Sequence, residues 1–184
     1  AREVQRIPGT NGDALRAVQN MPGIARPPFA TGLIVVRGAA PEDTAIFAEG
    51  GEIPLVYHFG GLTSVVPSDL LERIDFYPGN FAARYGRVSA GVIDVGLRAP
   101  RGDRFHLMAQ ASVIDAGLRV EGPITRNLSF LVAARRSYLD ATLGLVTDLL
   151  PFRSIRLPVY WDWQAIVEWR PTPRDRVRLL GFGS

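Results

Sequence analysis

Residues 160–170 alternate between apolar and polar side chains, and this alternation constrains the fold more than any other feature. Successive side chains of a β-strand point to its two opposite faces. One face would carry Trp161, Trp163, Ala165, Val167 and Trp169. The other face would carry Tyr160, Asp162, Gln164, Glu168 and Arg170. Ile166 is the one apolar residue on that face. Tryptophans at both ends of such a strand match the two aromatic girdles of a transmembrane β-barrel, which border an apolar band about 25 Å tall.

The same period of two governs much of residues 105–182. Apolar residues take the odd positions over 105–113 and the even positions over 114–120, so we predict a tight hairpin near 113–115. The remaining expected elements are strands over 128–138 and 176–182, short turns at 125–127 and 171–174, and a long loop at 140–158. Short turns alternating with a long loop fit the periplasmic and extracellular ends of an outer-membrane barrel.

Five such strands do not close a barrel, because single-chain barrels begin at about eight strands. An open sheet edge is not viable in lipid, where every backbone group needs a partner. We therefore expect the chain to be a piece of a larger protein, or to need the remaining barrel strands from elsewhere. The alternative is an ordinary β-sandwich with alternating faces, against which the strand length, the tryptophan placement and the polar opposite face all argue.

The first 98 residues have a different pattern, that of a small α+β domain punctuated by glycine. We expect a helix capped by Thr10 or Asn11, with Asp13 in its first turn, that ends at Pro22-Gly23. The expected strands cover residues 3–7, 33–36, 44–48, 73–77 and 91–97. Residues 98–104, rich in proline, glycine and charge, mark a boundary between domains 1–98 and 99–184. A compact domain joined directly to barrel strands suggests an outer-membrane channel that carries its own plug.

Composition excludes several classes of function. The chain has no cysteine, which excludes disulfides, thiol catalysis and thiolate metal sites. Its net charge of +3 is spread out, so nucleic acid is not an expected partner. The two histidines lie far apart, and no phosphate loop or hydrolase motif occurs. We expect no enzymatic activity, no cofactor and no metal.

Short motifs occur in a fixed order along the chain: Ile7-Pro8-Gly9 and Met21-Pro22-Gly23 around the helix, Val36-Arg37-Gly38, Ile74 to Gly79 and Arg84 to Val95. This ordered set resembles the plug domain and first barrel strands of TonB-dependent outer-membrane receptors, whose corresponding last two motifs are I-E-V-x-x-G and Y-G-x-x-x-x-G-V-I-N-V. Glu49-Gly50-Gly51 stands where the family has an Asp-Gly turn, which puts that turn in doubt. The short segment that contacts the coupling protein in the family is not recognised in these residues.

The resemblance implies energised uptake of a bulky, scarce nutrient across a Gram-negative cell outer membrane. The ligand would be a small molecule such as a ferric siderophore, cobalamin or a glycan, and the partners would be outer-membrane lipid and a TonB-type energy-coupling protein. Arg37 and Arg87 match family arginines that meet barrel glutamates. Two other functions stay open: an outer-membrane scaffold or interaction protein with the same fold and no transport, and a soluble β-rich binding domain.

The loop that contains Tyr57, His58 and Phe59 is the candidate substrate contact. Aromatic side chains with one titratable imidazole suit a loop tip that touches a ligand. The alternative is a loop that packs on the barrel wall. Trp161, Trp163 and Trp169 are the expected membrane girdle.

Overall fold

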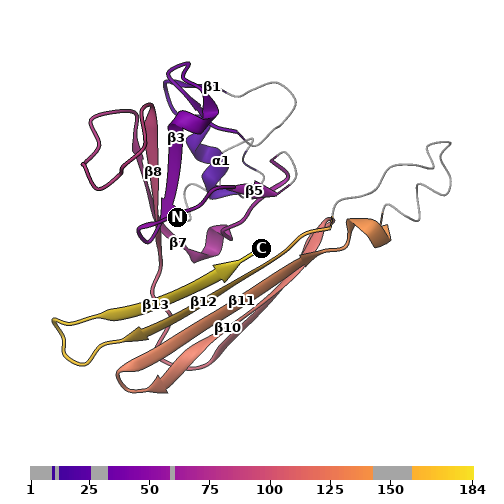
Figure 1. Cartoon of the computed structure of the whole chain (residues 1–184). Helices are drawn as coiled ribbons and strands as arrows, with labels where there is room; N and C mark the ends of the chain where they lie inside the picture. The colour runs from indigo at the N-terminus through magenta and orange to yellow at the C-terminus, as the bar shows by residue number, and fades with distance from the viewer. Residues whose placement is uncertain (1–9, 11–12, 26–32, 59–60, 143–158) are drawn as a thin grey trace. The chain divides into compact units, whose positions relative to one another are not determined.

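A computed structural model describes residues 10, 13–25, 33–58, 61–142 and 159–184. The chain divides into two compact units, Ala1–Arg98 and Ala99–Ser184 (Figure 1). The first unit is a mixed α+β domain and the second is one antiparallel sheet. Among the described residues, no helix combines the length and the apolarity needed to cross a membrane.

A four-stranded sheet with the order β4-β3-β8-β7 forms the centre of the first unit. Its strands are β3 (Thr44–Ala48), β4 (Gly51–Glu52), β7 (Leu71–Tyr77) and β8 (Gly91–Leu97). The pairing of β3 with β8 is parallel and the other two pairings are antiparallel. Every residue of β8 is buried, as expected for a strand covered on both faces. The strands predicted over 44–48, 73–77 and 91–97 are confirmed.

Shorter elements surround this sheet. They are α1 (Ala14–Val18), the pair β1 (Ile24–Ala25) and β2 (Val35–Val36), the pair β5 (Tyr57–His58) and β6 (Thr63–Ser64), and the 3-10 turns η2 (Pro41–Asp43) and η3 (Ser68–Leu70). The strand expected over 33–36 is thus shortened to its last two residues. The strand expected over 3–7 lies outside the described residues.

The helix cap differs from the prediction. Asp13, which we placed in the first turn, is the N-cap of α1, and its Oδ1 accepts a hydrogen bond from the Leu15 N–H at 3.0 Å. Its Oδ2 accepts from the Ser64 N–H at 2.9 Å. Thr10 is buried and contributes its carbonyl, which accepts from the Asp13 N–H. Asp13 displaces the predicted caps because one carboxylate satisfies the helix and a distant hairpin together.

The turn between β3 and β4 is kept although the usual aspartate is replaced. Glu49 and Gly50 both have positive φ, 50° and 85°, which is the type I′ geometry of a two-residue hairpin. The Glu49 Oε1 accepts a hydrogen bond from the Leu97 N–H of β8 at 2.7 Å. The longer side chain therefore ties the turn to the neighbouring strand.

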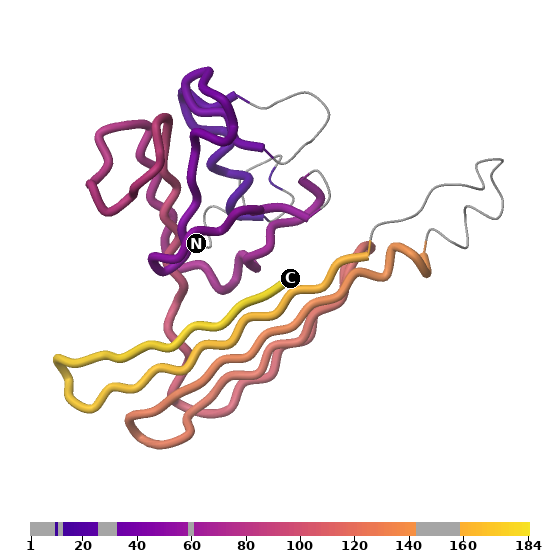
Figure 2. The backbone as a smooth tube through the Cα atoms, viewed as in Figure 1, coloured from indigo at the N-terminus to yellow at the C-terminus, as the bar shows by residue number. Residues whose placement is uncertain are grey.

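The second unit is a meander of five antiparallel strands in chain order (Figure 2). Its strands are β9 (His106–Ala111), β10 (Asp115–Thr125), β11 (Leu128–Ser137), β12 (Trp161–Trp169) and β13 (Val177–Gly183). The hairpin predicted near 113–115 is confirmed, since β9 ends at Ala111 and β10 begins at Asp115. Most of the predicted long loop, residues 143–158, lies outside the described residues.

Candidate functional site

The five-stranded sheet exposes its apolar face and buries its polar one. On β12, Trp161 and Trp169 are 55% and 49% exposed, whereas Asp162 and Glu168 between them are 1% and 2% exposed. The neighbouring strands follow the same rule: Leu179 on β13 is 69% exposed. A soluble protein shows the opposite distribution, with charges outside and aromatic residues inside. This is the side-chain distribution of a membrane barrel wall.

The strand register places the charged residues of different strands on one face. Asp162 of β12 is the cross-strand partner of Arg135 on β11, which in turn is opposite Gly117 of β10. On β12, Ile166 lies on this polar face, as the alternation predicted, and it is fully buried. The opposite face follows from the same register, which pairs Trp163 with Ala134. We call these the polar face and the apolar face of the sheet.

One charge network lies at the end of the sheet where β10 and β12 begin and β11 ends. The Arg135 guanidinium donates to the Asp162 Oδ2 from Nε at 3.0 Å and from Nη2 at 2.6 Å. Its Nη1 lies 3.7 Å from the Asp115 Oδ2. That same oxygen accepts the Tyr160 hydroxyl at 2.7 Å, and the Asp115 Oδ1 accepts the Ser112 hydroxyl at 2.7 Å. One buried arginine is thus shared by two buried carboxylates.

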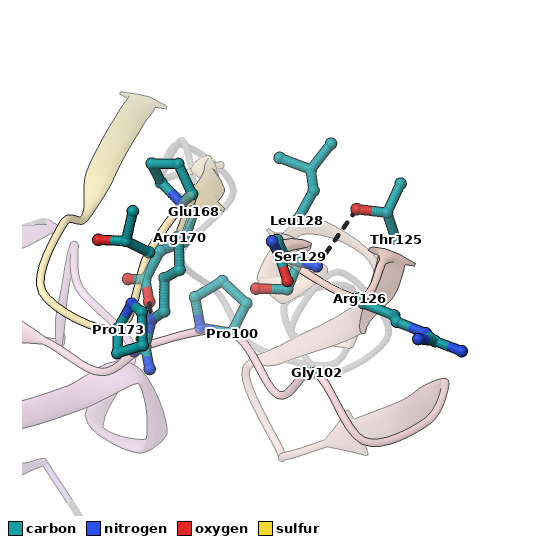
Figure 3. Close-up of a pocket in the computed structure, with 12 residues that line it drawn as sticks. Pro100, Gly102, Thr125, Arg126, Leu128, Ser129, Glu168, Arg170 and Pro173 are labelled. Atoms are coloured by element: carbon teal, nitrogen blue, oxygen red, sulfur yellow. Dashed lines mark hydrogen bonds and ion pairs between the residues drawn. The ribbon is translucent and has the colours of Figure 1, made fainter.

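A second network lies at the opposite end of the sheet. Glu168 accepts hydrogen bonds from Arg178 at 2.9 and 2.7 Å on Oε2, and from the Arg170 Nε at 2.7 Å on Oε1. A pocket of about 550 Å³ adjoins this pair, between the β10–β11 and β12–β13 turns and the segment around Pro100 (Figure 3). Its other lining residues come from these turns, the adjoining strand ends and residues 100–102, and they form no catalytic set.

A third network fixes the segment that enters the sheet. Glu121, 1% exposed, accepts a hydrogen bond from the Arg101 N–H at 3.0 Å, and the Arg119 Nε lies 3.5 Å from its Oε1. His106, opposite Glu121 in the register, lies 2.8 Å from the Asp103 carboxylate through Nε2. This hydrogen bond lowers the pKa of Asp103. Glu121 was not among the residues predicted from the sequence.

The two predicted plug–barrel arginines are both exposed in the first unit. Arg37 follows β2 with φ 52°, and its N–H donates to the Gly23 carbonyl at 2.7 Å. A Cβ on Gly79 would stand 3.2 Å from the Arg37 Nη1, so this side chain extends along the Gly79 turn. Arg87, with φ 62°, lies between β7 and β8. Their pairing with barrel glutamates stays a prediction.

The candidate substrate loop forms the β5–β6 hairpin. Tyr57 is 7% exposed and His58 is half-buried, while Phe59 lies outside the described residues. Helix α1 holds this hairpin, because Arg16 donates to the Gly61 carbonyl and, at 2.9 Å, to the Leu62 carbonyl. The buried Tyr57 is therefore part of the body of the first unit. The sequence carries no signal for the Arg16 contacts, which join residues 45 and 46 positions apart.

No group of three or more metal-ligating side chains occurs among the residues that the structure describes. The three tryptophans all lie on the apolar face, Trp161 and Trp169 at its two ends and Trp163 one step inward. The Trp163 indole lies over the neighbouring strand β13, since a Cβ on Gly183 would stand 2.7 Å from the indole Nε1. The glycine leaves space for the indole.

Comparison with known proteins shows the family of the first unit. The profile of the TonB-dependent Receptor Plug Domain family matches residues 2–93, half of the chain. Two mutants of the ferric enterobactin receptor PfeA from Pseudomonas aeruginosa are each 22% identical, with TM-scores of 0.56 and 0.57, over 98% of this chain and 33% of theirs. The outer membrane transporter YddB from Escherichia coli is 12% identical, with a TM-score of 0.57, over 97% of this chain and 31% of its own. No curated protein matches. The chain thus spans about a third of the length of these solved structures.

Proposed function

Because this chain belongs to the TonB-dependent receptor plug domain family, we propose that it forms the plug and first five barrel strands of a Gram-negative outer-membrane receptor. The receptor takes up a bulky, scarce nutrient when a TonB-type protein supplies energy. The observation that carries this proposal is the sheet with an exposed apolar face and a buried charged face that directly follows the plug. A plug inside a wide barrel blocks leakage until a partner pulls on it.

The dimensions of β12 support the membrane placement. Trp161 and Trp169 are eight residues apart, which at about 3.4 Å per residue is about 27 Å along the strand. A strand tilt of about 40° reduces this to about 21 Å along the membrane normal, close to the apolar band of about 25 Å. The two tryptophans then lie at the two borders of the hydrocarbon, as girdle residues do. Trp163 extends the girdle near Trp161.

Arg37 and Arg87 are the proposed contacts from the plug to the barrel. Both side chains are exposed, and both residues have the left-handed backbone geometry of turns and lie outside the strands. An Arg–carboxylate pair removed from water is bidentate and would hold the plug in register. We expect Arg37→Ala to loosen the plug and to raise sensitivity to large antibiotics, with Arg126→Ala in a barrel turn as the control.

The substrate class is proposed as a ferric siderophore, cobalamin or a glycan. One solved structure similar to this chain is a ferric enterobactin receptor, which favours a ferric siderophore for the first trials. We assign the ligand contact to His58 at the β5–β6 hairpin, while the buried Tyr57 anchors that hairpin.

The test is to extract the native protein that carries this chain from membranes and to measure its intact mass and its partition between aqueous and detergent phases. A species much larger than 20.1 kDa in the outer-membrane fraction supports the proposal. A soluble species of that mass contradicts it. Uptake of radiolabelled ferric siderophores, with and without the energy-coupling partner, then separates a transporter from a scaffold with the same fold.

A further inference from the structure

The apolar face of the sheet carries one charged residue among the described strands, Arg136 of β11. All other positions that the register places on this face between β9 and β13 are apolar, glycine or threonine. A charge on the lipid-facing side of a barrel strand destabilises the barrel, so this exception needs a physical reason.

Arg136 has no carboxylate beside it on the sheet. Its cross-strand neighbours are Ala116 on β10 and Trp161 on β12, and its side chain is exposed. Within the described part of the chain, its guanidinium makes no hydrogen bond or ion pair. Arg135, the preceding residue, points to the other face, where Asp162 and Asp115 share its charge. The two adjacent arginines therefore face different environments.

The height of Arg136 along the strand places it at the border of the apolar band. It is the last apolar-face residue of β11, next to Trp161 at the end of β12, and Tyr138 follows two residues later. An arginine costs about 2–4 kcal/mol at the bilayer midplane but about 0–1 kcal/mol near the interface. A long side chain at this height extends its guanidinium to the headgroups while its methylene stem stays among the acyl chains.

We propose that Arg136, beside Trp161, binds the phosphate of an anionic membrane-lipid headgroup at the rim of the barrel. This inference rests on the proposed function, because it requires the sheet to be in a bilayer. The guanidinium is planar and presents paired N–H donors that match two phosphate oxygens. Charge complementarity selects this occupant, since the exposed cation lies where lipid phosphates are the concentrated anions. Trp161 supplies the amphipathic ring that prefers the same depth.

The test is a titration of phosphatidylglycerol into the native protein that carries this chain, in detergent, with bound lipids counted by native mass spectrometry. Phosphatidylcholine and inorganic phosphate are the comparison probes. The variants are Arg136→Gln, Arg136→Lys and, as a matched control, Arg126→Gln in the turn at the other end of β11. We expect Arg136→Gln to weaken the first phosphatidylglycerol site about fivefold. Arg136→Lys, which keeps the charge, should lose less, and Arg126→Gln should leave this site unchanged.

Three results would overturn the inference. Equal phosphatidylglycerol affinity in the wild type and Arg136→Gln removes the site. If inorganic phosphate binds at Arg136 as tightly as phosphatidylglycerol does, the site recognises phosphate alone and not a lipid. A band-shift assay reports folding into the bilayer separately: a protein that inserts but shows no Arg136 dependence refutes this inference alone, whereas one that never inserts refutes the proposed function as well.

Discussion

Removing the Asp162 carboxylate should destabilise the barrel strands strongly. The side chains of Asp162 and Arg135 are 0% and 8% exposed, and two hydrogen bonds join them. Breaking a buried ion pair from one side costs about 3–5 kcal/mol, because it leaves an uncompensated charge. In the variant, the Asp115 carboxylate, 3.7 Å from the Arg135 Nη1, still partly neutralises the Arg135 charge. We therefore predict the lower end of that range, about 3 kcal/mol, for Asp162→Ala.

The assay is urea unfolding of the native protein in lipid vesicles, followed by the mobility shift of the folded barrel. Asp162→Leu, Arg135→Leu and the double variant form a thermodynamic cycle that isolates the pair. We expect the double variant to be more stable than Arg135→Leu, because it leaves one buried carboxylate, Asp115, without its arginine, whereas Arg135→Leu leaves two. Arg126→Leu is the control, since this arginine is exposed in the turn between β10 and β11.

The reasoning is refuted if Asp162→Ala costs less than about 1 kcal/mol, the value of an exposed ion pair. It is also refuted if Arg135→Leu and Arg126→Leu have the same effect. Either result would mean that the polar face is hydrated well enough for the charges not to need one another.

Three further predictions concern the plug. Gly91→Ala places a Cβ 3.0 Å from a buried valine of β2 and should lower urea stability by about 1–3 kcal/mol, while Gly86→Ala, with nothing within 4 Å, should change it little. Burial raises the pKa of Asp13 above its usual 3.8, so the folded state binds this proton more readily than the unfolded state. Stability should therefore fall as pH rises from that value through the raised pKa, and Asp13→Asn should flatten this slope in urea titrations at acidic pH. Burial raises the pKa of Tyr85, and so does the Asp94 carboxylate, which accepts a hydrogen bond from the Tyr85 hydroxyl at 2.6 Å. Asp94→Asn should therefore lower the pKa of Tyr85, measured by an ultraviolet titration of tyrosinate. An unchanged pKa would contradict the Asp94 contribution.

The alternation of side chains allowed the two faces of the sheet to be predicted from sequence. A period of two fixes which residues share a face within one strand, and the change of phase near residue 113 located the first hairpin. The resemblance to TonB-dependent receptors, which the plug-family match confirms, predicted the plug. Periodicity does not give the partners of a charge across strands. Arg135 and Asp162 are 27 residues apart, and their pairing depends on a register set by the whole β11–β12 hairpin.

Local sequence patterns did not predict the helix cap or the β3–β4 turn correctly, because a distant contact determines each of them. Thr10 and Asn11 are good helix caps by type, but Asp13 is chosen because its second oxygen reaches the Ser64 N–H. The replaced Asp-Gly turn put the β3–β4 hairpin in doubt, yet Glu49 keeps it with a hydrogen bond to β8. In both cases the deciding partner lies about 50 residues along the chain.

The central claim is that the second unit faces lipid with its apolar side and the barrel interior with its charged side. Single-cysteine variants test it directly, because this chain has no cysteine of its own. Spin labels at Gln164, Ala165, Ile166 and Val167 in the reconstituted native protein should alternate in their accessibility to lipid-soluble oxygen. We predict high accessibility at Ala165 and Val167 and low accessibility at Gln164 and Ile166. Uniform accessibility, or the reverse alternation, would contradict the claim.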